Sequence, residues 1–364
     1  MRRLLALALI VTCCAAGWRS AGTPYVFSFP RDHGSHPNYR LEWWYFTGHL
    51  LADDGHRYGF ELTIFRIGIT PGAPTPRPGQ SRWRSGEIFP AHFALSDDTG
   101  GRFSYAERLV RPALGEAGAA REALDVHAGD WSVRGIEPIR LHAQTRAEGV
   151  TLRLRSLKPP AVQGHDGISR KGSCASCASH YYSMTRLVGE GSVRVGARRQ
   201  SVRALVWMDH EFGSDELESN VVGWDWFALQ LSDGREVMLY HLRRRNGTFI
   251  PASSGSVVAR DGGVRHLRAA DFSIVPVGAW RSPHSHALYP SGWIVHVPLA
   301  ALSVRIVPRL RDQELVSRGV SYWEGDVCLE PLSTAASNRA AVEGACTMGQ
   351  GYVELTGYAG EVPR

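Results

Sequence analysis

Lysine is nearly missing from this chain. Only Lys158 and Lys171 occur among its 41 basic residues, so arginine carries almost all of the positive charge. The formal net charge is +6, but the arginines are scattered and alternate with apolar residues, as in the run 152–155. A nucleic-acid-binding protein usually gathers its positive charge into a stripe or an arm. The diffuse pattern therefore argues against nucleic-acid binding and favours the solvated faces of strands.

Long apolar runs are also missing, except at the start of the chain. Arg2 and Arg3 precede an apolar run over residues 4–16 that is too short to span a bilayer. This order is typical of an export signal, which we expect at residues 1–22. The protein is then expected in the periplasm or at the periphery of the outer membrane. Lipid attachment at Cys13 or Cys14 is an alternative, and only then would we expect contact with a membrane.

Cysteine is scarce beyond the expected signal, where four remain. Cys328 and Cys346 flank a loop rich in Gly, Ala and Ser, and in an oxidising compartment they are expected to form a disulfide. Cys174 and Cys177 form a CxxC motif without a second pair of ligands or a strand–helix context. A local disulfide or free thiols are therefore favoured over a zinc site or a thioredoxin-like centre.

Metal and hydrolase motifs are missing as well. The pairs His33/His36 and His284/His286 each lack a nearby third ligand, so no metal and no cofactor are expected. There is no GxSxG nucleophile elbow. His210 is followed by Glu-Phe-Gly-Ser rather than by the second histidine of HExxH. The sequence gives no support to a serine hydrolase or a zinc peptidase.

The chain is instead rich in strand patterns. Residues 59–66, 92–96 and 237–242 alternate apolar and polar side chains, and Asp-Gly turns recur at 54–55, 233–234 and 261–262. Helical periodicity is scarce, with one short helix expected within residues 107–124, and residues 71–86 are expected to form a loop. Many short strands joined by hairpin turns predict an all-β sandwich or barrel.

An internal repeat predicts that this β-domain is duplicated. The run 43–46 (WWYF) leads to an Asp-Gly turn and an alternating strand, and 224–227 (WDWF) does the same. Residues 92–95 match 271–274 and residues 182–187 match 352–358, at similar spacings. We therefore expect two tandem antiparallel β-barrel domains, at residues 23–200 and 201–364.

Several motifs in a fixed order resemble one known family. They are HPNY at 36–39, EWWYFTG at 42–48, AHFALSD at 91–97, QG at 163–164, SRKG at 169–172, YYSMTRL at 181–187, WMDHEF at 207–212, GWDWF at 223–227, DQEL at 312–315, YWEG at 322–325 and GYVELTGY at 351–358. The chain resembles the carotenoid 1,2-hydratase (hydroxyneurosporene synthase) and AttH-like family, in particular its exported branch labelled as predicted secreted hydrolases. The resemblance implies two lipocalin-like barrels that bind an extended apolar molecule, isoprenoid or lipid. In named members it implies hydration of an isoprenoid double bond, or polyene cyclisation in fungal relatives.

Hydration of an unactivated alkene needs a strong proton donor, a positioned water and aromatic faces beside the cationic transition state. Asp209 and Glu211 lie two residues apart and share one face of a strand, whereas Asp225 sits between Trp224 and Trp226. A carboxyl group packed against indoles has a raised pKa, as a general acid near neutral pH requires. These three carboxylates are the candidate catalytic residues. The candidate ligand-binding aromatics are Trp43, Tyr45, Trp207, Trp224, Trp226, Tyr240 and Trp323.

Alternatives remain open for these residues. Glu42 and Glu324 also adjoin aromatics, but for them a structural role is favoured, as the acceptor of an indole N–H or the partner of an arginine, since buried charges are normally paired. The same structural role stays open for Asp209 and Asp225. The whole protein is interpreted either as a cofactor-free hydratase or cyclase, or as a lipid carrier that transforms nothing. The resemblance associates a carrier with a lipid or lipoprotein export transporter. A scaffold with filled barrels is a third hypothesis.

Overall fold

The structure is a computed structural model that describes residues 17–71, 85–214, 217–317, 319, 321–332 and 346–360. Most of the expected export signal, both Cys13 and Cys14, and most of the expected loop at 71–86 lie outside these residues. Within the described ranges, no helix combines the length and the hydropathy needed to cross a membrane.

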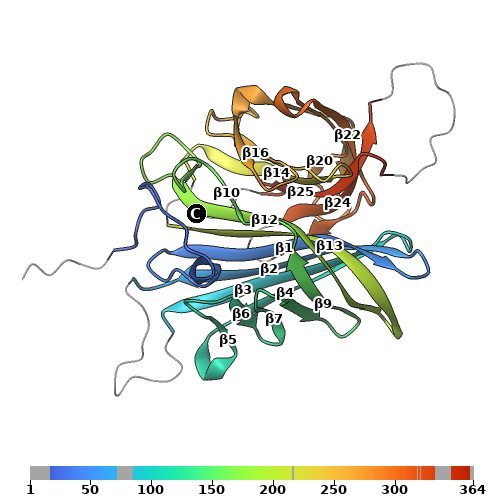
Figure 1. Cartoon of the computed structure of the whole chain (residues 1–364), viewed down its shortest axis with the longest axis horizontal. Helices are drawn as coiled ribbons and strands as arrows, with labels where there is room; N and C mark the ends of the chain where they lie inside the picture. Colours follow the sequence, from blue (N-terminus) through green and yellow to red (C-terminus); the bar gives the residue numbers. More distant parts are fainter. Residues whose placement is uncertain are drawn as a thin grey trace, which may run out of the picture.

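Two large antiparallel sheets make up the fold (Figure 1). The first contains β1 (Leu41–Ala52), β2 (Arg57–Gly68), β3 (Glu87–Asp97), β4 (Arg102–Val110), β5 (Ala117–Ala119), β6 (Asp125–Ala128), β7 (Trp131–Arg134), β8 (Ile139–Gln144), β9 (Glu148–Ser156), β10 (Ala161–Val162), β11 (Ser169–Arg170), β12 (Ala178–Val195) and β13 (Arg198–Gly213). The second contains β14 (Val221–Leu231), β15 (Glu236–Arg244), β16 (Ser254–Val258), β17 (Val264–Arg268), β18 (Ser273–Pro276), β21 (Trp293–Val297), β22 (Leu302–Pro308), β23 (Glu314–Leu315), β24 (Tyr322–Pro331) and β25 (Gly349–Thr356). The smaller elements are the β19 (Ala279–Arg281)–β20 (Leu288–Pro290) hairpin and the 3-10 turns η1 (Arg31–His33), η2 (Ala113–Gly115), η3 (Ala269–Asp271) and η4 (Pro298–Ala300).

The all-β prediction is confirmed. The first sheet curls into a nearly closed barrel, and the second forms a half-barrel. The short helix expected within residues 107–124 is wrong, because this stretch forms the end of β4, the turn η2 and the strand β5. Pro112 explains the difference, since a proline disfavours the helical conformation of the residue before it, and Gly115 adopts a positive φ of 78°.

The two sheets repeat one strand order. In the first, β1 lies between β2 and β13; in the second, β14 lies between β15 and β25. The Asp-Gly turns that follow β1 and β14 are equivalent too, since Gly55 and Gly234 both adopt a φ of +87°. The predicted match between residues 43–46 and 224–227 thus joins equivalent strands.

The other two predicted matches join strands that are not equivalent. Residues 92–95 lie in β3, whose counterpart by sheet order is β16, whereas residues 271–274 run from η3 into β18. Residues 182–187 lie in β12, but the counterpart of β25 is β13. An alternating pattern is common to every strand with one buried face, so a short match does not identify equivalent strands.

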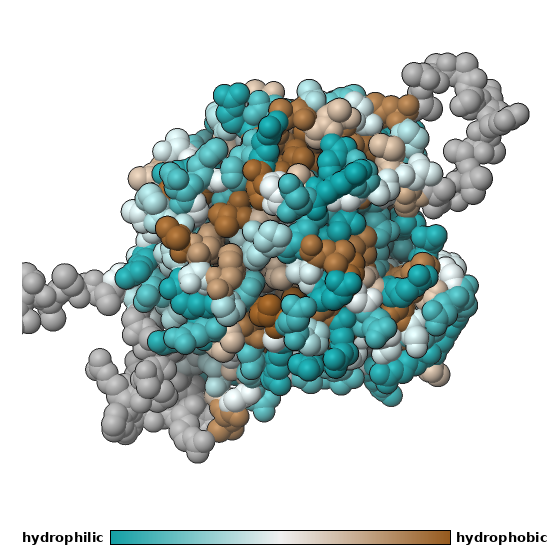
Figure 2. All heavy atoms as spheres, viewed as in Figure 1, coloured by the Kyte–Doolittle hydropathy of each residue, from teal (hydrophilic) through white to brown (hydrophobic). Residues whose placement is uncertain are grey.

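The chain passes from the first sheet to the second between Gly213 and Val221. This is downstream of the expected boundary at residue 200, because β13 pairs along its length with β1 and β12 of the first sheet. On the face seen in Figure 2, apolar residues are interspersed with polar ones.

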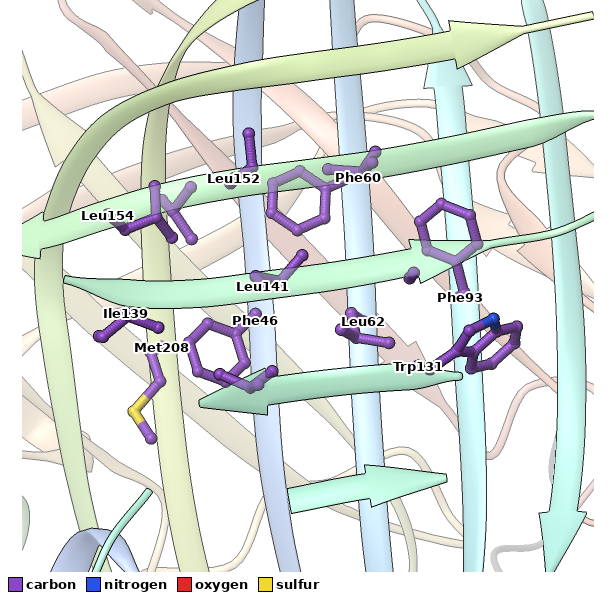
Figure 3. Packing of buried hydrophobic residues seen from close by; sticks show 14 of the residues in the cluster. Phe46, Phe60, Leu62, Phe93, Trp131, Ile139, Leu141, Leu152, Leu154 and Met208 are labelled. Carbon is purple, nitrogen blue, oxygen red and sulfur yellow. The ribbon is translucent and has the colours of Figure 1, made fainter. Parts of the chain in front are cut away.

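Apolar side chains fill the interior of each barrel. In the first, Phe46, Phe60 and Phe93 point from the long strands β1 to β3 toward Trp131 and Leu141 on the strands that cross them (Figure 3). The second barrel has a separate buried core, which includes Phe227, Trp293 and Trp323. Because the side chains alternate along each strand, the residues between these core positions face outward.

Candidate active site

The outward faces of the two sheets pack against each other. In Figure 1 the layer with β1 and β13 lies against the layer with β14, β24 and β25. A buried aromatic cluster joins them, with Tyr45 and Trp207 from the first sheet and Trp226 and Tyr240 from the second. The ring centroids of Tyr45 and Trp226 are 5.2 Å apart, and those of Trp207 and Trp226 are 6.3 Å apart. We call this region the inter-barrel layer.

Asp209 lies in the inter-barrel layer with a nearly buried side chain. Its carboxyl group accepts hydrogen bonds from the Tyr181 hydroxyl at 2.6 Å, the Ser183 hydroxyl at 2.6 Å and the Trp207 indole at 2.7 Å. Burial raises the pKa of Asp209 to about 7, although the three donors act to lower it and the charge of Glu211 adds to the rise. Asp209 can therefore hold a proton near neutral pH, and the three donors stabilise the carboxylate that remains after the proton leaves.

Glu211 lies beside Asp209 on the same face of β13, as the sequence predicts from their two-residue spacing. Its Oε1 atom accepts a hydrogen bond from Ser179 and lies 2.9 Å from the Lys171 ammonium. That ammonium is also 4.5 Å from the ring centroid of Tyr240, a residue of the second sheet. His210 points the opposite way, into the first barrel, as expected for the residue between them.

Three further carboxyl groups lie in the inter-barrel layer. Glu61 on β2 and Glu324 on β24 are buried, and Glu354 on β25 is partly buried. Glu324 and Glu354 are direct cross-strand partners, and Glu324 accepts a hydrogen bond of 2.6 Å from the Tyr45 hydroxyl of the other barrel. Glu61 accepts a hydrogen bond from Thr63. One oxygen each of Glu61 and Glu324 has no hydrogen-bond partner among the described residues.

These three groups also favour the protonated form. Burial raises the pKa of Glu354 to about 7, with the charges of Asp209 and Glu211 adding to the rise. Burial, together with the neighbouring carboxylates, raises the pKa values of Glu61 and Glu324 well above their ordinary range. The carboxyl groups of the inter-barrel layer thus influence one another: the charge of one raises the pKa of the next, so their titrations are coupled.

Sequence reasoning did not single out Glu61 and Glu354, and for Glu324 it favoured a structural role, with an indole N–H or an arginine as its partner. The available signal was the outward register: Tyr322, Glu324 and Asp326 alternate along β24, and Tyr352 and Glu354 along β25. Polar residues in outward positions are normally read as solvated. Only the packing of one sheet against the other shows that Tyr322, Glu324, Asp326 and Tyr352 are buried.

Asp225 is not brought to the inter-barrel layer. Its carboxylate pairs with Arg243 and accepts a hydrogen bond from Tyr358 at 3.1 Å, on the inward face of the second sheet. Its ladder partners are His241 and Leu355, whereas Trp226 and Glu354 point to the other face. Burial raises the pKa of Asp225, while the Arg243 charge opposes the rise.

The predicted ligand-binding aromatics are divided in the same way. Trp323 lies in the core of the second barrel and donates its indole hydrogen to the Arg311 carbonyl oxygen at 2.7 Å. Trp43 and Trp224 are only partly buried, at the edge of the inter-barrel aromatic cluster. Tyr45, Trp207, Trp226 and Tyr240 belong to that cluster itself.

The four cysteines that lie in the described part of the chain form two disulfides, Cys174–Cys177 and Cys328–Cys346. The first is in the loop between β11 and β12, next to Lys171, and the second joins β24 to the segment that enters β25.

One cluster of the described residues places three potential metal ligands within 4.8 Å of one another: His36, Glu42 and His210. Glu42 Oε1 lies 2.8 Å from His36 Nδ1 and 2.9 Å from His210 Nε2, and Glu42 Oε2 lies 2.9 Å from Arg66 Nε. The Arg66 guanidinium thus supplies the positive charge that a metal ion would bring. Glu42 is the paired carboxylate that the sequence favoured.

A cleft of about 230 Å³ opens where the two sheets meet, at one end of the inter-barrel layer. Its lining includes Asp98 and His49 from the first barrel and Arg309 and Asp326 from the second. Burial raises the pKa of Asp326 to about 6, although Arg309 opposes the rise. A Cβ atom at Gly59 would lie 2.6 Å from Asp326 Oδ2, so this close approach of the two barrels requires a glycine.

A model of the AttH-like family matches residues 20–358. The chain belongs to the AttH-like family. The resemblance of the sequence to this family is thereby confirmed, and the match spans both barrels.

Solved structures agree with this membership. An AttH-like protein from Nitrosomonas europaea, whose crystal structure is known at 2.00 Å, is 30% identical, with a TM-score of 0.79 over 92% of this chain and 98% of that one. Kievitone hydratase from Nectria haematococca has a TM-score of 0.65 over 95% of this chain and 97% of its own. At 12% identity this second likeness shows a shared fold. A search of curated proteins finds no match.

Proposed function

We propose that the inter-barrel layer of this AttH-like protein is an acid site that protonates a carbon–carbon double bond of an extended apolar substrate. Asp209 is the proton donor. The observation that carries this assignment is its environment: a carboxyl group buried between two barrels, with its pKa raised to about 7, that receives three hydrogen bonds. A group with these properties is protonated near neutral pH and has a stabilised conjugate base.

The reaction balances without a redox partner. The Asp209 carboxyl transfers its proton to one alkene carbon, and the π electrons form the new C–H bond. The neighbouring carbon becomes cationic, and the ring faces of Trp207 and Trp226 and the carboxylate that the proton transfer leaves on Asp209 stabilise it. Water then adds to the cation and returns its proton to Asp209. If a second double bond attacks the cation instead, a new C–C bond closes a ring and the positive charge moves to a further carbon. A proton lost from the neighbouring carbon to the Asp209 carboxylate then gives a neutral cyclic alkene, so one site serves a hydratase or a cyclase. Neither reaction requires a cofactor or a metal.

The carrier hypothesis remains as a second candidate function. Like the enzyme, a carrier would use the aromatic walls of the inter-barrel layer, since apolar side chains occupy the barrel interiors. A carrier has no need of a proton donor, so the raised pKa of Asp209 favours the enzyme. Under either function we propose that the protein is exported to the periplasm or the outer-membrane periphery. A carrier would there exchange lipid with an export transporter.

The first test is mass spectrometry of an organic extract of protein purified from its own host. A stoichiometric isoprenoid or lipid identifies the ligand class and supplies a substrate. Turnover is then measured in D₂O, where hydration places one deuterium on carbon. Asp209→Asn should abolish this incorporation, and Asp130→Asn, an exposed acid on the first barrel, should not. Stoichiometric ligand without turnover in the wild type would establish the carrier instead.

A further inference from the structure

We infer that the Cys174–Cys177 disulfide is a thiol–disulfide exchange site for a dithiol reductant, and that its state controls whether Lys171 reaches the inter-barrel layer. This goes beyond the proposed function. The exchange can be tested without substrate, so it stands or falls separately from turnover.

The two sulfur atoms differ in access. Cys174 is exposed, whereas Cys177 is 3% exposed and precedes β12 directly. An incoming thiolate can therefore attack the Cys174 sulfur and displace the Cys177 thiolate, which takes up a proton. The second thiol of the reductant then attacks the mixed disulfide and releases Cys174 as a thiol. The reductant becomes a disulfide, and the CxxC pair gains two electrons and two protons.

The disulfide closes the loop that holds Lys171. The β11–β12 hairpin pairs Ser169 with Ser179 and Arg170 with Ala178, so Lys171 is the first residue beyond the ladder. Its backbone N–H donates to the Cys177 carbonyl oxygen at 2.8 Å, and the Cys177 N–H donates to the Cys174 carbonyl oxygen at 3.1 Å. The backbone of Lys171 is thus attached to the same residue that the disulfide holds.

The Lys171 side chain connects this loop to the acid site. Its ammonium lies 2.9 Å from Glu211 Oε1 and over the rings of Tyr181 and Tyr240, which belong to different barrels. The Tyr240 hydroxyl donates to the Arg170 carbonyl oxygen at 3.3 Å, so the hairpin itself touches the second barrel. Opening the disulfide frees the loop from its covalent closure and lets the ammonium leave Glu211.

Other contacts also hold the loop, and they must break after reduction of the disulfide if Lys171 is to move. The Ser173 N–H donates to Glu218 Oε2 at 2.8 Å, and Arg170 donates to the Ala175 carbonyl oxygen at 2.9 Å. Both contacts are at the surface, where water competes for the same groups. The buried contacts of Lys171 are therefore the backbone bond to Cys177, which the disulfide holds, and the ion pair of its ammonium with Glu211.

The scarcity of lysine makes the test specific. The folded protein is treated with or without dithiothreitol, briefly labelled with an amine-acetylating reagent, and mapped by mass spectrometry. Lys158 is an internal control, because its ammonium is buried and bonded to Glu236 and to two backbone carbonyl oxygens of the second barrel. We expect the labelling rate of Lys171 to rise roughly tenfold or more on reduction, while Lys158 stays protected.

Alkylation of the freed thiols shows which disulfide has opened. The inference requires opening of Cys174–Cys177 while Cys328–Cys346 stays intact. The double variant Cys174→Ser/Cys177→Ser should label at Lys171 without reductant. The inference is overturned if the CxxC disulfide resists dithiothreitol in the folded protein, or if it opens and Lys171 stays protected. It is equally overturned if both lysines become reactive together, since that indicates general loosening.

Discussion

The hydroxyl of Tyr45 on β1 donates a hydrogen bond of 2.6 Å to Glu324 Oε1 on β24, which joins the two barrels through a phenol and a carboxyl group that are both buried. The other oxygen of Glu324 has no hydrogen-bond partner among the described residues. Glu324 therefore depends on Tyr45, a residue of the opposite barrel, for its hydrogen bond.

Replacing Tyr45 with Phe should destabilise the protein by about 1–3 kcal/mol, because both oxygens of Glu324 then lack a donor in a buried site. Chemical denaturation of the wild type and the variant measures the difference. Tyr105→Phe is a matched control, since the Tyr105 hydroxyl also reaches the second barrel, at the Val316 carbonyl oxygen, but from an exposed position. An equal loss in both variants would show that burial adds nothing to the Tyr45 contact.

Asp209→Asn should reduce turnover by about 10²–10⁴-fold, the usual contribution of a general acid. It should also change how stability depends on pH. The pKa of Asp209 is raised to about 7 in the folded protein, from about 4 in an unfolded chain. The folded state thus keeps a proton that the unfolded state loses, and this stabilisation is complete below about pH 4 and lost as pH rises toward 7.

The free energy of unfolding of the wild type should therefore fall relative to that of Asp209→Asn between pH 4 and 7, since the amide does not titrate. Urea denaturation of both proteins at several pH values measures this difference. A difference that stays constant over this range would mean that Asp209 titrates normally in the folded protein.

Much of the fold could be predicted from the sequence, because strand alternation and Asp-Gly turns are local signals. Gly55 and Gly234 adopt the left-handed conformation that such turns require, and the strands that follow them, β2 and β15, contain the alternating runs 59–66 and 237–242. The relation between the halves was only partly predictable. Tryptophan-rich β1 and β14 could be matched, but ordinary alternation misassigned β3 and β12.

The site was predictable only where residues are neighbours in sequence. Asp209 and Glu211 share a face because strands have a period of two, and the structure places them together. Glu61, Glu324 and Glu354 come from three other strands of two barrels. Their meeting depends on how the outer faces of the barrels pack, which no local pattern encodes.

Glu211→Gln should lower the pKa of Asp209. Burial is the main cause of its raised value, but the negative charge of Glu211 adds to it, and the amide removes that charge. If Asp209 is the general acid, the alkaline limb of the pH–rate profile should move to lower pH. Glu190→Gln, an exposed change at the outer part of β12, should leave the profile in place. A shift to higher pH would contradict the repulsion between the two carboxylates.

Metal removal should leave the protein unchanged. The Glu42 carboxylate is already bonded to His36, His210 and Arg66, and hydrogen bonds from the two histidines keep its pKa below the ordinary value despite burial. We expect the same melting temperature with and without a chelator, measured by calorimetry. Stoichiometric metal in the purified protein, with a lower melting temperature after chelation, would refute charge compensation by Arg66.

Asp225 should act in stability and not in turnover, because it pairs with Arg243 inside the second barrel. Arg243→Met leaves a buried carboxylate without its cation and should cost about 3–5 kcal/mol, whereas the double variant Arg243→Met/Asp225→Asn should recover part of this loss. Arg243 also stacks over Tyr358 at 3.8 Å and donates to the Thr356 carbonyl oxygen, so recovery should be incomplete. Denaturation of the four members of this cycle gives the coupling energy.

Turnover per folded molecule of Asp225→Asn should equal that of the wild type. If this variant is as stable as the wild type but inactive, Asp225 reaches the reacting atoms, and the division between a structural acid inside the barrel and a proton donor between the barrels is incorrect.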